Sequence, residues 1–200
     1  MNITQRQSPN RAIGRQNNTP DFIVLHTTGA GFQSAINTIM NPANQVSYHF
    51  VISRDGDIVQ AVDIENTAWA NGTNNTAGDN RNNQHSTIPT VRERRINANL
   101  FSISIGFADM PAGNPSPKQF YAAVDLIRHI VEEVRRIYGH TIPFERSNIV
   151  GHDEITPRTR QTAPAGRSRG MSFYAILTTR AKHPIICHYR KNLRPRRRAR

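Results

Sequence analysis

The chain has 200 residues, 36% of them hydrophobic, and a formal net charge of +12. This length suffices for one compact domain with a sizeable buried core. No stretch approaches the roughly 20 apolar residues of a membrane span, the N-terminus lacks an apolar secretion signal, and the single cysteine, Cys187, excludes an intrachain disulfide.

The positive charge is concentrated at the C-terminus. Residues 1–154 contain 13 Lys and Arg residues against 14 Asp and Glu residues, a net charge of −1, whereas residues 155–200 contain 13 Lys and Arg residues and no acidic residue. Such a tail attracts polyanions of any kind. No helix-turn-helix, zinc-finger or RNA-binding motif accompanies it. We therefore expect non-specific polyanion binding by the tail and no sequence-specific nucleic-acid recognition.

The first half of the chain predicts two buried elements and a hairpin. Residues 1–20 are polar, and we interpret them as an N-terminal arm. The apolar run FIVLH at 22–26 predicts a buried strand, and FQSAINTIM at 32–40 predicts a short helix that ends at an Asn-Pro pair. Residues 48–53 and 58–62 flank an Arg-Asp-Gly-Asp turn, which predicts a β-hairpin.

The second half begins with an Asn-rich polar segment, residues 71–97, which we interpret as a surface loop. The alternation in FSISIGF, residues 101–107, predicts a strand. An apolar stripe at helical spacing from 117 to 138, preceded by Ser-Pro and followed by Gly, predicts a long helix. A last short strand is expected at 147–150. The order of these elements predicts an α/β fold with a mixed central sheet flanked by helices.

Two of the eight histidines lie where predicted strands end. His26 closes the strand at 22–26 and is followed by small residues, and His152 follows the strand at 147–150 and Gly151. Neutral imidazole nitrogens are standard zinc ligands, and a catalytic zinc site keeps one position open for water. Each histidine alone is also compatible with an ordinary core or surface position. His49 lies inside the hairpin strand, and we interpret it as structural.

Five sequence segments together resemble one protein family. In this order they are similar to the zinc-dependent N-acetylmuramoyl-L-alanine amidases of the phage-lysozyme and bacterial types, whose fold the peptidoglycan recognition proteins share. The resemblance covers about residues 20–160. The segments are FIVLHTTGA, VSYHFVISRDGDIVQAV, TAWANGT, NLFSISIGF and SNIVGHDEITPRTR.

The resemblance implies a single amidase-like catalytic domain at residues 21–160. It implies that His26 and His152 are two of three Zn²⁺ ligands and that Tyr48 lies over the metal as a catalytic residue. The implied reaction is hydrolysis, by a zinc-activated water, of the peptidoglycan amide between N-acetylmuramic acid and L-alanine. For Tyr48 the alternative is an ordinary aromatic residue of a strand. The expected protein is a monomeric phage or prophage lysin that stays in the cytoplasm until lysis.

Four positions depart from the family pattern. Gly106 stands where many relatives have a Glu that shuttles protons, and Ala70 stands where relatives often have His. The family's third zinc ligand, a Cys or Asp before Pro-Gly, aligns with Ala163, and a catalytic Lys aligns with Gln161. These departures imply an impaired amidase. The alternative is a catalytically inactive pseudoenzyme that binds peptidoglycan.

The segment RQTAPAG, residues 160–166, suggests a reason for the missing ligand. Some codon choices for it spell Thr-Asn-Cys-Pro-Gly when read from the third base of the Arg160 codon. One hypothesis is therefore that the basic tail, residues 161–200, is an out-of-frame translation. The alternative is a genuine basic tail on a degenerate amidase. Codons in the gene that cannot spell Cys-Pro-Gly one base out of register would exclude the frameshift.

Overall fold

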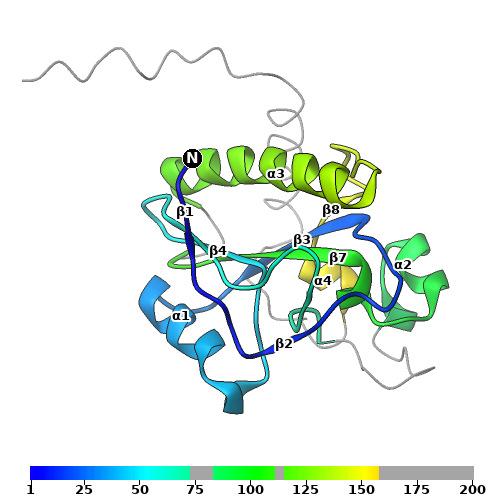
Figure 1. Cartoon of the computed structure of the whole chain (residues 1–200), viewed down its shortest axis with the longest axis horizontal. Helices are drawn as coiled ribbons and strands as arrows, with labels where there is room; N and C mark the ends of the chain where they lie inside the picture. The colour runs from blue at the N-terminus through cyan, green and yellow to red at the C-terminus, as the bar shows by residue number, and fades with distance from the viewer. Residues whose placement is uncertain (73–82, 111–114, 158–200) are drawn as a thin grey trace, which may run out of the picture.

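A computed structural model describes residues 1–72, 83–110 and 115–157 of the chain (Figure 1). Its centre is a six-stranded sheet in the order β1-β5-β4-β7-β3-β8. The β4–β5 pair is antiparallel and every other neighbouring pair is parallel. The predicted mixed α/β sheet is therefore confirmed. The proposed ligand position Ala163, Gln161, Cys187 and the basic tail at 161–200 lie outside the described residues.

The strands agree with the apolar runs of the sequence. The antiparallel pair β4 and β5 is the predicted hairpin, and β3, β7 and β8 are the strands predicted at 22–26, 101–107 and 147–150. A separate two-stranded sheet pairs β2 with β6. The strands are β1 (Ile3–Gln5), β2 (Arg11–Ala12), β3 (Phe22–Thr27), β4 (Phe50–Ile52), β5 (Ile58–Gln60), β6 (Thr67–Ala68), β7 (Ser102–Phe107) and β8 (Ile149–Gly151).

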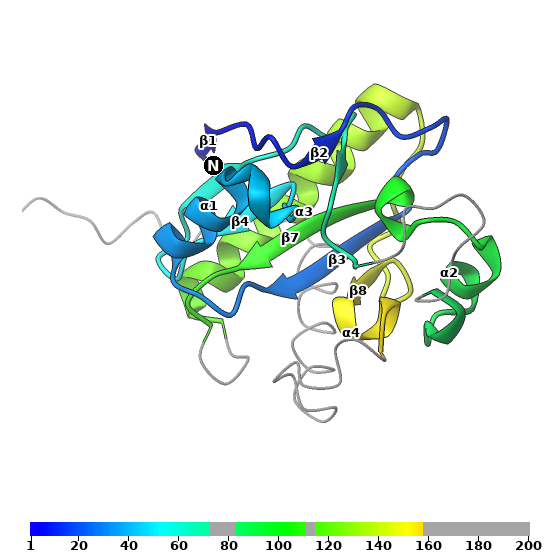
Figure 2. The same ribbon diagram turned by 90° about the horizontal axis from the view of Figure 1, so that it is seen from below.

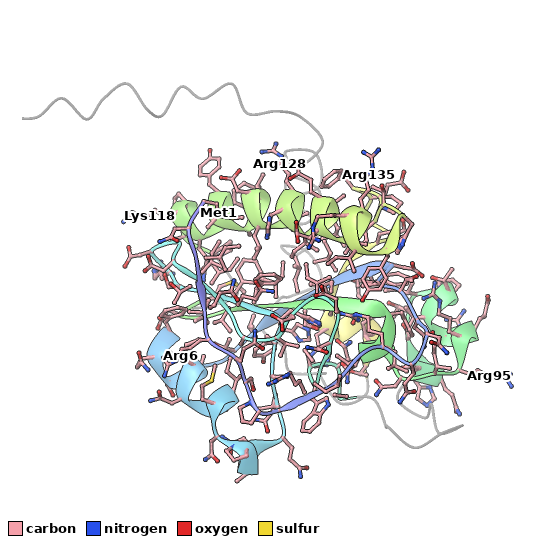
Figure 3. The ribbon with its side chains drawn as sticks, viewed as in Figure 1. Met1, Arg6, Arg95, Lys118, Arg128 and Arg135 are labelled. Carbon is pink, nitrogen blue, oxygen red and sulfur yellow. The ribbon has the colours of Figure 1, made fainter. Side chains whose placement is uncertain are left out.

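Helix α3 (Pro117–Tyr138) covers one face of the sheet (Figure 1). It begins where the Ser116 hydroxyl accepts a 3.1 Å hydrogen bond from the Gln119 amide, and it ends at Gly139, whose φ of 75° suits the left-handed C-cap. These are the predicted bounds. Its apolar stripe packs on buried side chains of the sheet to form the largest core cluster. On its outer side, Arg128 and Arg135 point away from the sheet (Figure 3).

Three short helices cover the opposite face: α1 (Phe32–Met40), α2 (Pro89–Arg94) and α4 (His152–Ile155) (Figure 2). Helix α1 packs on β4 and β5, whereas α2 and α4 pack on β3 and β8. Single 3₁₀ turns occur at Pro42–Asn44, Asn83–His85 and Ala98–Phe101. The face opposite α3 therefore carries two separate apolar clusters.

The expected surface loop at 71–97 contains regular structure. Residues 83–97 form a 3₁₀ turn and α2, whose Val91 is completely buried beside Phe22 and Phe101. A six-residue helix anchored by one apolar side chain is too short to show a 3.6-residue period. The sequence pattern therefore could not reveal it.

The first 20 residues are part of the domain and not a separate arm. Strand β1 pairs in parallel with β5 at the edge of the sheet, and β2 pairs with β6. Arg15 is 4% exposed and donates hydrogen bonds to four backbone carbonyls. The segment was misread because its contacts are made by backbone groups and polar side chains, which leave no apolar pattern.

In the described part of the chain, every helix is too short or too polar to cross a membrane.

Candidate metal centre

The two predicted metal ligands lie together at one edge of the sheet. Strands β3 and β8 are neighbouring and parallel, and Leu25 pairs with Gly151. Leu25 and Gly151 are each followed in the chain by a histidine, so the topology brings His26 and His152 to the same level across 126 positions of sequence. Their Nδ1 atoms are 3.0 Å apart and their ring centroids 4.4 Å apart.

Both rings are buried on the face of the sheet that carries α1 and α4. Because side chains alternate along a strand, His26 shares its face with Val24 and Phe22. It is 4% exposed and His152 is 9% exposed. Burial of this kind excludes most water from the two nitrogens and strengthens their interaction with a cation.

A hydrogen bond fixes the tautomer of His152. Its Nε2 lies 3.0 Å from the backbone oxygen of Asn71, which can only accept. Nε2 therefore carries the proton, and Nδ1 presents its lone pair toward His26. Proteins usually orient a metal-binding histidine by a hydrogen bond from the ring nitrogen that does not bind the metal, often to a backbone carbonyl.

The distance between the rings fits a shared ion. Two nitrogens that each lie about 2.0–2.1 Å from a tetrahedral zinc are separated by about 3.3–3.4 Å. The observed 3.0 Å needs only a small rotation of one ring to match. The chemistry of the donor pair and its geometry both fit Zn²⁺.

The turn that presents His152 is held by Glu154. The Glu154 carboxylate accepts a 2.7 Å hydrogen bond from the Gly151 amide and forms a 2.7 Å ion pair with Arg146. It thus caps the first turn of α4, where a negative charge is favourable. Burial, together with the nearby Glu154 carboxylate, raises the pKa of Asp153.

Tyr48 packs against the first of the two histidines. Its ring centroid is 5.1 Å from that of His26, at a tilt of 56°. Gly106 pairs with His26 in the sheet, and a Cβ atom at Gly106 would lie 3.0 Å from Tyr48 Cδ2 and 3.1 Å from Thr28 Cγ2. The tyrosine ring therefore occupies space that a side chain at position 106 would need.

His49 is placed in the core. It is completely buried, its Nδ1 accepts a 3.0 Å hydrogen bond from the Ser104 amide, and its Nε2 lies 3.2 Å from the Asn66 carbonyl oxygen. Burial lowers the pKa of His49 well below its ordinary value, and the Arg15 guanidinium 2.8 Å away lowers it further. The ring is neutral and its partners are structural groups.

A cavity of about 550 Å³ lies at the end of β3, after His26. Its wall includes Thr27, the residue after His26, together with Arg54, Asp109 and Met110. Asp109 Oδ2 accepts a 2.9 Å hydrogen bond from the Phe32 amide at the start of α1. The cavity has the size of a small-molecule or short-peptide site.

Within residues 1–72, 83–110 and 115–157, no group of three His, Cys, Asp or Glu side chains could hold a metal ion. In these residues the structure brings together two candidate ligands, His26 and His152. The positions that the sequence assigned to the third ligand and to the catalytic lysine, Ala163 and Gln161, are not among those residues.

The sequence profile of the N-acetylmuramoyl-L-alanine amidases matches residues 16–166. The chain belongs to this family. By membership it is an N-acetylmuramoyl-L-alanine amidase in fold and enzyme class, from a family that is generally zinc-dependent. The match begins inside residues 1–20, at the residue that follows the buried Arg15.

Solved amidase structures have the same fold. A mutant of PlyL is 17% identical with a TM-score of 0.60, over 92% of this chain and 100% of that chain. AmpD is 22% identical with a TM-score of 0.55, over 88% of this chain and 93% of that chain. The catalytic domain of XlyA is 22% identical with a TM-score of 0.54, over 88% and 99%. A search of curated proteins gave no match.

Sequence reasoning missed the polar residues that surround His152. Asn71 and Asn99 are 0% and 3% exposed, yet both lie in stretches rich in asparagine that are typical of surface loops. Asn71 belongs to the TAWANGT segment of the family resemblance, and Asn99 is the first residue of the NLFSISIGF segment. Membership in these segments is the available indication for both residues, and it does not say which contacts they make.

Proposed function

We propose that the protein hydrolyses the peptidoglycan amide between N-acetylmuramic acid and L-alanine, with a zinc ion held by His26 and His152 through Nδ1. One observation carries the proposal: the two Nδ1 atoms lie 3.0 Å apart, in a buried site, in a chain of the amidase family. A bound zinc would supply an activated water, because it lowers the pKa of that water toward 7.

The chain's own residues have separate tasks in this proposal. The Asn71 carbonyl orients His152 through its Nε2 proton. The hydroxyl of Tyr48, whose ring packs on His26, donates a hydrogen bond to the negative charge that develops on the substrate carbonyl oxygen. The cavity beside Thr27 receives the part of the substrate next to the scissile bond.

The third ligand position determines how well the site works. With Ala163 there, two imidazoles hold zinc more weakly than the usual three ligands would. We therefore expect a low zinc affinity and impaired turnover. The alternative is a pseudoenzyme that binds peptidoglycan without metal. Elemental analysis separates the two functions: a bound zinc favours the amidase, and a metal-free chain that still binds the wall favours the pseudoenzyme.

The substitution His26→Ala tests the site. It removes one of the two zinc ligands in the described residues, so zinc binding and release of peptide from peptidoglycan should both fall by more than about 100-fold. The matched control is His129→Ala on α3, which covers the opposite face of the sheet and should change neither quantity. Unchanged turnover in His26→Ala would refute the assignment.

A further inference from the structure

We propose that Asn99 is a positioning residue for the metal centre, acting on His152 through the backbone of Ala70 and Asn71. The inference rests on the proposed role of His152 as a ligand and extends it to a residue that touches neither histidine in the contacts described above. It concerns how the lone pair of His152 Nδ1 is kept aimed at His26.

The side-chain oxygen of Asn99 accepts hydrogen bonds from two consecutive backbone amides. Asn99 lies in the 3₁₀ turn Ala98–Phe101 that leads into β7, and its side chain is turned inward, 3% exposed. Its Oδ1 accepts hydrogen bonds from the Asn71 amide at 2.9 Å and from the Ala70 amide at 3.3 Å. Ala70 and Asn71 are 5% and 0% exposed, so without this oxygen both amides would lose their acceptor in a buried position.

The peptide of Asn71 is fixed from a second side. Its side-chain Nδ2 donates a 2.9 Å hydrogen bond to the Ser102 hydroxyl, which in turn donates a 2.8 Å hydrogen bond to the Ala98 carbonyl. Asn71, Ala98 and Ser102 are completely buried, and Asn99 is 3% exposed. Asn71 is therefore fastened to the start of β7 by its backbone amide and by its side chain.

The backbone carbonyl of Asn71 is the group that contacts His152. The Asn71 oxygen accepts the 3.0 Å hydrogen bond from His152 Nε2. As long as this oxygen stays in place, the proton stays on Nε2 and the Nδ1 lone pair faces His26. If Asn99 loses its amide oxygen, two buried amides lose their acceptor, the carbonyl shifts, and the ring can take the other tautomer.

The test measures Zn²⁺ affinity of the full chain by competition with a chromophoric chelator. Asn99→Ala removes the acceptor, so affinity should fall about 10–100-fold, the usual cost of a lost outer-shell partner. Asn99→Asp keeps an oxygen at the same position and should recover most of the affinity. A merely structural role would not predict this rescue.

Asn10→Ala is the matched control. Asn10 is also a buried asparagine, 1% exposed, and its Nδ2 donates to the carbonyls of Ile39 and Asn41, so its loss also leaves buried backbone groups unpaired. It should lower the stability without lowering zinc affinity. Equal zinc affinity in Asn99→Ala and the wild type, an equal loss in Asn10→Ala, or no recovery in Asn99→Asp would each overturn the proposal.

A second measurement does not need bound metal. In the zinc-free wild type, ¹⁵N chemical shifts of the His152 ring should show the proton on Nε2, and in Asn99→Ala they should show a mixture of tautomers. If Asn99→Ala does not fold, Asn99→Ser, whose hydroxyl ends short of the amide oxygen, replaces it. A wild-type chain that binds no zinc would contradict the proposed function, whereas a His152 proton on Nδ1 would contradict the role of Asn99.

Discussion

The ring of Tyr48 packs so closely over Gly106 that it leaves no room for a side chain at this position. A Cβ atom added at Gly106 would lie 3.0 Å from Tyr48 Cδ2, closer than side chains normally approach. Gly106→Ala should therefore push the tyrosine ring aside by a few tenths of an ångström. We expect amidase activity to fall about tenfold, with zinc content unchanged because neither histidine is replaced.

The control for Gly106→Ala lies two positions earlier on the same strand. The Ser104 hydroxyl is buried and has no hydrogen-bond partner among the described residues. Ser104→Ala therefore removes one atom without breaking a contact, and it should keep full activity. If the two alanine variants have the same activity, the packing of Tyr48 on Gly106 has no part in turnover.

His49 gives the folded protein a pH dependence. Because its pKa is lowered by burial and by Arg15, the ring stays neutral in the folded state while the unfolded chain takes up a proton near pH 6.5. The unfolded state then binds more protons, so stability falls as the pH falls below 6.5, by about 1.4 kcal/mol per pH unit. Urea unfolding between pH 7 and pH 5 measures this slope.

The comparison variant for this slope is His49→Gln, which cannot titrate. The other histidines contribute equally to both proteins, so the difference between the two curves isolates His49. Parallel curves for the wild type and His49→Gln would show that the ring takes up a proton in the folded state as well.

At the scale of elements, Arg15 joins the N-terminal segment to the rest of the domain. Its guanidinium donates to the carbonyls of Ile64, Asn99, Leu100 and Ser102 at 2.7–3.2 Å. Burial lowers the pKa of Arg15 to about 10, so it remains charged at neutral pH.

Arg15→Met keeps the length of the side chain but leaves these buried carbonyls without a donor. The free energy of unfolding should fall by about 3 kcal/mol or more, measured by urea denaturation. Arg6→Met is the matched control, because Arg6 is exposed at the surface (Figure 3), and it should change the stability by less than about 0.5 kcal/mol. Similar stabilities of the two variants would mean that Arg15 does not anchor the segment.

The helices and strands that the sequence predicted are those whose apolar residues recur at a regular spacing. Helices α1 and α3 have the predicted bounds because each buries a regular stripe and ends at a capping or breaking residue. Helix α2 and strand β1 were missed because one buried side chain, or three edge residues paired through their backbone, leave no period. Polar residues such as Asn99 are recognisable only once the chain is folded.

At the scale of the whole molecule, the histidine pair of the candidate metal centre is a product of sheet topology. His26 and His152 are 126 residues apart, and they meet because β3 and β8 are parallel neighbours whose carboxyl ends share one edge. The sequence located both histidines because each follows an apolar run. Their pairing came from the family resemblance, since no local pattern records which strands are neighbours.

The uneven charge of the chain leads to the last prediction. Residues 167–200 contain 11 Lys and Arg residues and no acidic residue, whereas residues 1–166 contain 15 Lys and Arg residues against 14 Asp and Glu residues. Deleting 167–200 should abolish binding to heparin or DNA, which requires release of counterions and weakens steeply with salt. Peptidoglycan binding should persist, because the histidine pair and the cavity at the end of β3 lie in the remaining part. A scrambled tail of the same composition should bind DNA as well as the natural one, since charge alone is responsible. DNA binding that survives the deletion would place the basic surface on the near-neutral domain, where the charge distribution does not predict it.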